Sequence, residues 1–184
     1  MTHGTLETID GRPALRFERT LAFPVERVWR AVSVPAELER WFPAAADWTP
    51  AAGEIIEAGG ATGEVLEVAP PRRLAWTFAG QFYSFDLTPE GDGCRLVFTH
   101  VIDDRGLSAQ TATGWEAYLS RLEPLLRGEE LSEQDAHAGW EETHERYAEL
   151  FGVDPAPGRR FAAALRGNSG DSGSGDSGAN GVGA

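Results

Sequence analysis

The segment from Arg72 to Ile102 constrains the fold most strongly, because large side chains alternate along three consecutive runs. A period of two is typical of β-strands with one buried face. Residues 79–81 and 90–93 contain glycine and are predicted to form the hairpin connections between the runs. So wide an apolar face requires cover from a helix, a ligand or both. It comprises Leu74, Trp76, Phe78, Tyr83, Phe85, Leu87, Cys94, Leu96, Phe98 and His100.

Four more strands are predicted upstream of this segment. Residues 5–10 and 15–23 alternate in polarity, with a turn between them. Residues 54–58 and 63–68 are apolar runs separated by a glycine pair. The pattern therefore predicts a chain rich in strands, with four runs ahead of the three aromatic ones.

Helical spacing appears in two places between and after these strands. Residues 24–34 and 35–42 predict two short helices, each preceded or started by proline. A longer helix follows the last strand, and Pro124 is expected to kink it because proline lacks the N–H that continues the ladder. The apolar face of this helix holds Trp115, Leu119, Leu122 and Leu126, with Tyr118 beside it.

The C-terminal third predicts one acidic helix and a disordered tail. Helical spacing runs over 132–152, where Ser132 and Asp135 resemble a capping box. The stretch 129–149 holds eight carboxylates against Arg146 alone. Residues 1–152 are therefore predicted to form one domain that includes this additional helix. Residues 153–184 are rich in glycine and serine toward their end and are predicted to be disordered.

Composition excludes several partners. The chain has 184 residues, no lysine and a net charge of −13, so we expect no nucleic-acid partner and no membrane partner. A single cysteine, Cys94, forbids an internal disulfide. The first ten residues lack the features of a signal peptide, and no apolar run reaches transmembrane length. The cytoplasm is the predicted location.

Several segments together resemble a known superfamily. They are residues 23–29, Trp41-Phe42-Pro43, residues 63–74, residues 93–96 and Thr99-His100. From Thr5 to Gly152 the chain is similar to the START-like (SRPBCC) superfamily, which includes polyketide cyclases. Within it, the chain resembles the family named for homology to the activator of the heat-shock chaperone ATPase.

The resemblance implies an α+β helix-grip fold. In that fold a curved antiparallel sheet wraps around a long C-terminal helix, and two short helices lie between the first strands. An apolar cavity between the sheet and the helix is the feature that the superfamily shares. The chain is therefore expected to bind a small apolar or aromatic molecule there. The candidate ligand-binding residues are Trp41, Trp76, Phe78, Tyr83, Phe85, Phe98, His100, Trp115, Tyr118, Leu119 and Leu122.

Three alternatives stay open. The same aromatic residues can simply fill the core. The family resemblance and the acidic helix also suggest a protein-interaction module that binds a chaperone or another protein. Finally, His100 and Tyr83 would be the proton-transfer groups of a cyclase or hydrolase, although no recognisable catalytic motif is present.

No cofactor or metal is predicted. His137, Glu141 and His144 lie at i, i+4 and i+7, which would place them on one face of the predicted helix. This spacing differs from the His-Glu-x-x-His pattern of zinc proteases. We interpret the three residues as part of a solvated helix face.

Overall fold

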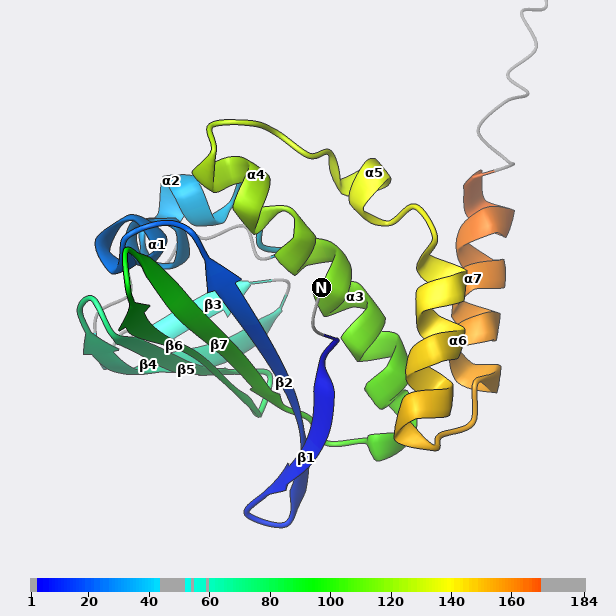
Figure 1. The fold of residues 1–184 in the computed structure, drawn as a ribbon. Coiled ribbons are helices and arrows are strands. Elements are labelled where there is room, and N and C mark those ends of the chain that lie inside the picture. Colours follow the sequence, from blue (N-terminus) through cyan, green and yellow to red (C-terminus); the bar gives the residue numbers. More distant parts are fainter. Residues whose placement is uncertain (1–2, 44–51, 54, 59, 170–184) are drawn as a thin grey trace, which may run out of the picture.

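The fold is seen in a computed structural model that describes residues 3–43, 52–53, 55–58 and 60–169. Within this part of the chain, seven strands form one antiparallel sheet in the order β1-β2-β7-β6-β5-β4-β3. Figure 1 shows the sheet curving around one side of a long helix, which confirms the α+β helix-grip prediction. The strands are β1 Thr5–Ile9, β2 Arg12–Leu21, β3 Ile55–Ala58, β4 Ala61–Ala69, β5 Arg73–Phe78, β6 Gln81–Glu90 and β7 Gly93–Val101.

The strand register places the large alternating side chains on one face, as the sequence predicts. Phe85 of β6 lies opposite Phe98 of β7, and Tyr83 lies opposite His100 two residues earlier. On the other side of β6, Tyr83 pairs with Trp76 of β5. Cross-strand neighbours on one face of a sheet stand about 5 Å apart, so these rings form a continuous aromatic surface. We call this surface the inner face.

Two short helices between β2 and β3, and a longer helical segment after β7, cover the inner face. The long helix is interrupted at Arg121, three residues before Pro124, where the sequence predicts a kink. Pro124 has no N–H to donate, so the ladder cannot continue regularly through it. In Figure 1, α3 and α4 run along the concave side of the sheet, with α1 and α2 at one end. The helices are α1 Val25–Ser33, α2 Pro35–Leu38, α3 Ser108–Ser120 and α4 Leu122–Leu126, with a short 3-10 turn η1 at Arg105–Leu107.

Two hydrogen bonds and an ion pair link the N-terminus to α3, to β2 and to the helix that carries Tyr147. The Gly4 N–H donates to the Tyr147 hydroxyl at 2.9 Å, and that hydroxyl donates to Glu116 of α3 at 2.5 Å. Glu116 also pairs with Arg19 of β2 at 3.3 Å, and both side chains are only 14% exposed. Burial, together with the hydrogen bond to Glu116, raises the pKa of Tyr147 above its ordinary range. The Tyr147 hydroxyl therefore stays protonated, and its hydrogen bond to Glu116 holds the helix that carries Tyr147, Trp140–Phe151, against α3.

The predicted helix over 132–152 is wrong as a single element. The structure has two helices there, separated at Gly139, whose φ of +78° places it in the left-handed region. Glycine adopts this conformation at little cost, and it lies directly before the second of the two helices. The Ser132 cap is confirmed, because its hydroxyl accepts from the Asp135 N–H at 3.0 Å. The helices are α5 Glu133–Ala136 and α6 Trp140–Phe151.

The predicted disorder from residue 153 onward is wrong for part of that stretch. A further helix, α7 Ala156–Ser169, packs beside α6 and extends the folded region beyond residue 152. Arg159 forms two hydrogen bonds with Glu145 at 2.7 and 2.6 Å, and Phe161 contacts Trp140 at a ring distance of 5.7 Å. These contacts offset the weak apolar pattern of α7. Residues 170–184, the rest of the predicted tail, lie outside the described residues.

Among the described residues, no helix is both long and apolar enough to cross a bilayer.

The surroundings of two glycines predict opposite effects on stability when each is replaced by alanine. A Cβ at Gly158 would lie 2.0 Å from His144 Nε2, whereas a Cβ at Gly114 in α3 would meet nothing within 4 Å. Gly158→Ala should lower the free energy of unfolding by about 1–3 kcal/mol, because the buried His144 ring must move. Gly114→Ala should raise it by about 0.5–1 kcal/mol through helix propensity. Urea unfolding measures both, and a Gly158→Ala variant as stable as the wild type would contradict the packing.

Candidate functional site

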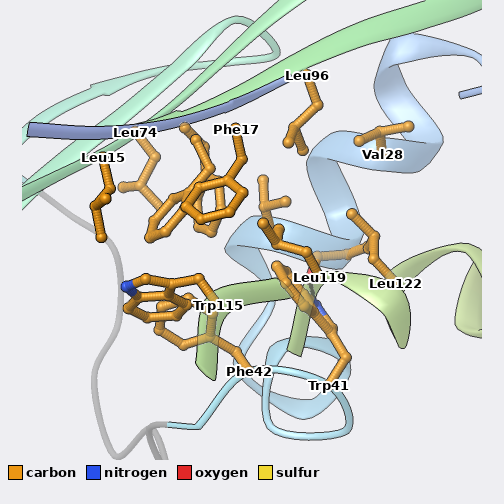
Figure 2. Close-up of a cluster of buried hydrophobic side chains, with 14 of the residues drawn as sticks. Leu15, Phe17, Val28, Trp41, Phe42, Leu74, Leu96, Trp115, Leu119 and Leu122 are labelled. Atoms are coloured by element: carbon orange, nitrogen blue, oxygen red, sulfur yellow. Dashed lines mark hydrogen bonds between the residues drawn. The ribbon is translucent and has the colours of Figure 1, made fainter. Parts of the chain in front are cut away.

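The predicted site residues fall into two groups by exposure. Most lie buried in one cluster between the inner face and α3 and α4, which Figure 2 shows from the side. Phe78, Tyr83 and Tyr118 are only partly buried at its margin. The buried members are Trp41, Trp76, Phe85, Phe98, His100, Trp115, Leu119 and Leu122. Their contact with a ligand stays a prediction.

The centre of the cluster is Phe42, which the sequence did not single out as a site residue. Its ring stacks on Trp115 at 5.2 Å and lies edge-on to Phe85 at 5.8 Å and Phe98 at 6.3 Å. Figure 2 shows Phe42 beside Trp115, between the sheet and the helices. The only signal for this role was its place in the Trp41-Phe42-Pro43 motif. Phe42 therefore packs between the sheet and α3, in contact with rings from both.

Trp41 serves as an anchor for the short helices. Its indole N–H donates to the Ala31 carbonyl of α1 at 2.8 Å, and the side chain is fully buried. A buried indole usually requires such a partner. Its ring also lies 5.9 Å from that of Phe85, so it links α1 to the sheet.

A stack of three rings marks the other end of the inner face. Tyr83 lies between Trp76, at 5.4 Å with an interplanar angle of 9°, and His100, at 4.1 Å and 17°. Tyr83 is partly exposed, whereas Trp76 and His100 are each only 4% exposed. Phe78, from the same end of β5, is also partly exposed. The β5–β6 end of the inner face is therefore its more accessible end, and we call it the Tyr83 end.

Hydrogen bonds fix the protonation state of His100. The Trp115 indole N–H can only donate, and it lies 2.8 Å from His100 Nδ1, which must therefore accept. The proton of the neutral ring is then on Nε2, which donates to the Gln81 side-chain carbonyl at 2.5 Å. Burial is the main reason that the pKa of His100 falls to about 3. The charge of Asp103 raises this pKa and the charge of Arg12 lowers it, both less strongly than burial. His100 is thus neutral at physiological pH.

This geometry suits binding better than proton transfer. Both ring nitrogens of His100 already have partners, so neither is free to take a proton from a substrate. Burial, aided by the charge of Asp103, raises the pKa of Tyr83 to about 12, so its hydroxyl stays protonated at neutral pH. Because Trp76 and His100 cover the two faces of the Tyr83 ring, the Tyr83 end offers the edge of this stack, the partly exposed Phe78 and a neutral hydroxyl.

Tyr118 belongs to a different environment from the rest of the predicted set. Its hydroxyl donates to Glu133 of α5 at 2.7 Å, and its ring meets His137 edge-on at 5.3 Å. Burial and this hydrogen bond raise the pKa of Tyr118 to about 12. Tyr118 therefore faces the C-terminal helices while Trp115, three residues earlier, joins the inner face.

The solvated helix face proposed for His137, Glu141 and His144 is wrong for His144. That side chain is 2% exposed and stacks on Trp140 at 5.0 Å with an interplanar angle of 4°. Glu141 pairs with Arg166 of α7. His137 lies beyond the break at Gly139, so the three side chains do not share a helix. In the part of the chain that the structure describes, no group of three His, Cys, Asp or Glu side chains is placed to hold a metal ion.

A curved seven-stranded antiparallel sheet wrapped around a long helix, with two short helices after its second strand, defines a START-like protein of the helix-grip class. More narrowly, the chain belongs to the Activator of Hsp90 ATPase homolog 1-like family, whose model matches residues 22–127. No curated protein matches the sequence.

Solved structures of similar fold come from several bacteria. The crystal structure of CalU16 from Micromonospora echinospora has 28% identity and a TM-score of 0.64, covering 80% of this chain and 95% of that one. MLL2253 from Mesorhizobium loti has 28% identity and a TM-score of 0.56, covering 64% and 99%. DynU16, a protein in the dynemicin biosynthetic locus, has 26% identity and a TM-score of 0.54, covering 63% and 48%. CalU16 thus matches well beyond the segment that the family model covers.

The neutral state of His100 predicts a pH dependence of stability. In the unfolded chain His100 takes up a proton below its ordinary pKa of 6.5, whereas in the folded protein it stays neutral down to about pH 3. Its contribution is fully present above pH 6.5 and is lost as the pH falls. Between those values the wild type should lose about 1.4 kcal/mol of unfolding free energy per pH unit more than His100→Gln. Urea unfolding at a series of pH values measures this, and parallel curves would contradict the assignment.

Proposed function

We propose that this protein binds a small apolar or aromatic molecule between the inner face of the sheet and α3, at the Tyr83 end. The observation that carries the proposal is the partly exposed Tyr83 ring, held parallel to Trp76 and His100. Because the fold already holds these rings in place, their side chains lose little conformational entropy when a ligand binds. An apolar ligand would pack against the exposed edge of this stack, in edge-to-face contact and with burial of apolar area.

The polar groups at this end suit a neutral ligand. Small-molecule sites are mostly apolar, with a few polar groups that orient the ligand. The Tyr83 hydroxyl stays protonated, with a pKa raised to about 12, and is able to donate to an oxygen atom of the ligand. His100 is uncharged and is held by Gln81 and Trp115, so it supports Tyr83 without adding charge.

The comparisons support a role near small-molecule chemistry. DynU16, which shares 26% identity with this chain, is a protein in the dynemicin biosynthetic locus. That description associates one protein of this fold with the biosynthesis of a small molecule. A protein that holds an apolar intermediate or product fits such a setting.

An uncharged aromatic dye, N-phenyl-1-naphthylamine, tests the proposal by fluorescence titration. Tyr83→Leu keeps an apolar side chain but removes the stacking ring, so the Kd should rise about 3- to 10-fold, as for the loss of one aromatic pair. Tyr118→Leu is the matched control, because Tyr118 faces the C-terminal helices, and it should leave the Kd unchanged. A dye that does not bind, or that responds only to Tyr118→Leu, would overturn the assignment.

A second candidate function is a protein-interaction module, which the family description favours. Fewer carboxylates of the acidic segment are available to a partner than its composition suggested, because Glu141 and Glu145 pair with arginines of α7. Glu142 and Glu149 remain exposed on α6. As exposed carboxylates seven residues apart on one helix, these two can meet a basic partner.

The double variant Glu142→Arg/Glu149→Arg tests this second candidate with a purified Hsp90-type chaperone. Charge complementarity predicts binding that weakens with salt, stimulation of ATP hydrolysis, and loss of both in the double variant. Tyr83→Leu serves as the control and should leave the interaction intact. Binding that ignores both salt and the double substitution would remove the electrostatic basis for this function.

A further inference from the structure

The C-terminal helices border a surface cavity, open to solvent, that is separate from the inner face. It has a volume of about 660 Å³ and lies between α3, α5, α6 and α7. This volume falls within the usual range for small-molecule sites. On the α3 side, a Cβ at Gly114 would meet nothing within 4 Å, so the helix leaves space there. Much of the lining comes from residues beyond position 127, outside the segment that the family model matches.

Aromatic rings line the cavity in two pairs. Tyr118 and His137 meet edge-on at 5.3 Å, and Trp140 and Phe161 lie 5.7 Å apart at an angle of 47°. Trp140 is partly buried and Phe161 is 41% exposed, so aromatic surface remains accessible at the cavity. His144 stacks on Trp140 at 5.0 Å and holds that ring in place. The walls are therefore rigid enough to receive an apolar body.

The charges at the cavity favour a cation. Glu133 and Glu141 contribute carboxylates, and Arg166 pairs with Glu141. Among the described residues, no arginine lies within ion-pair distance of Glu133, which instead accepts a hydrogen bond from Tyr118 at 2.7 Å. A carboxylate beside aromatic rings attracts an ammonium group through both Coulomb and cation–π interactions. The net charge of −13 adds a long-range attraction for positive ligands.

We propose that this cavity binds an aromatic amine in its protonated form. The ammonium group lies against Glu133 and the Tyr118 ring, and the aromatic body packs on Trp140 and Phe161. This site differs from the Tyr83 end in position and in chemistry, since carboxylates line it, whereas the polar side chains of the inner face at the Tyr83 end are the neutral Tyr83 and His100. Glu133, Trp140 and Phe161 lie beyond the segment that the family model matches, and Tyr118 lies within it.

Tryptamine and tryptophol test the charge selection directly, because they share the indole ring and differ in an amine against a hydroxyl. By calorimetric titration at neutral pH, tryptamine should bind the wild type about tenfold more tightly than tryptophol. Glu133→Gln keeps an acceptor for Tyr118 but loses the charge, so the two affinities should converge. Glu142→Gln, an exposed carboxylate of α6 outside the cavity lining, is the matched control and should keep the preference.

A second variant tests the aromatic wall without disturbing the charge. Phe161→Ala removes a half-exposed ring, so it should fold, and it should weaken both probes about 3- to 10-fold. Tyr83→Leu should leave the affinity for tryptamine unchanged, which separates this site from the inner face. Equal affinities for the two probes in the wild type, no tryptamine binding, or a preference that survives Glu133→Gln would each overturn the proposal.

Discussion

The insertion of Phe42 between the sheet and α3 is the contact on which the rest of the structure depends. Its ring touches Phe85 and Phe98 of the sheet on one side and stacks on Trp115 on the other. Truncating a buried phenylalanine typically costs about 3–5 kcal/mol. Phe42 therefore joins the segment after α2 to both the sheet and α3, while Phe78 and Tyr83 at the other end of the inner face stay partly exposed.

Helix α3 is the shared wall between two chemically different surfaces. Trp115 faces the sheet and fixes the neutral tautomer of His100, while Tyr118 faces the C-terminal helices and bonds Glu133. Trp115 and Tyr118 thus make hydrogen bonds on different sides of α3, one to a neutral histidine and one to a carboxylate. Buried polar groups of this kind are costly unless they have partners, and both have them. The two proposed sites, one for a neutral ligand and one for a cation, rest on this division.

Much of the fold could be predicted from the sequence because it rests on local patterns. The alternation from Arg72 to Ile102 and the helical stripe at Trp115 each reflect a repeating burial pattern. The break at Gly139 and the helix α7 could not be predicted in the same way. They depend on contacts between distant residues, such as Arg159 with Glu145, which outweigh a weak local pattern. The central place of Phe42 likewise depends on tertiary packing, since its position in the sequence shows only that it is apolar.

The binding of a neutral aromatic ligand at the Tyr83 end is tested most directly by the indole N–H signals in an NMR titration with N-phenyl-1-naphthylamine. The Trp115 indole donates to His100, which stacks on Tyr83, whereas the Trp41 indole donates to Ala31 of α1. We predict that the Trp115 signal shifts progressively with the dye while the Trp41 signal stays in place. A shift confined to the Trp140 signal, or no shift at all, would contradict binding at the inner face.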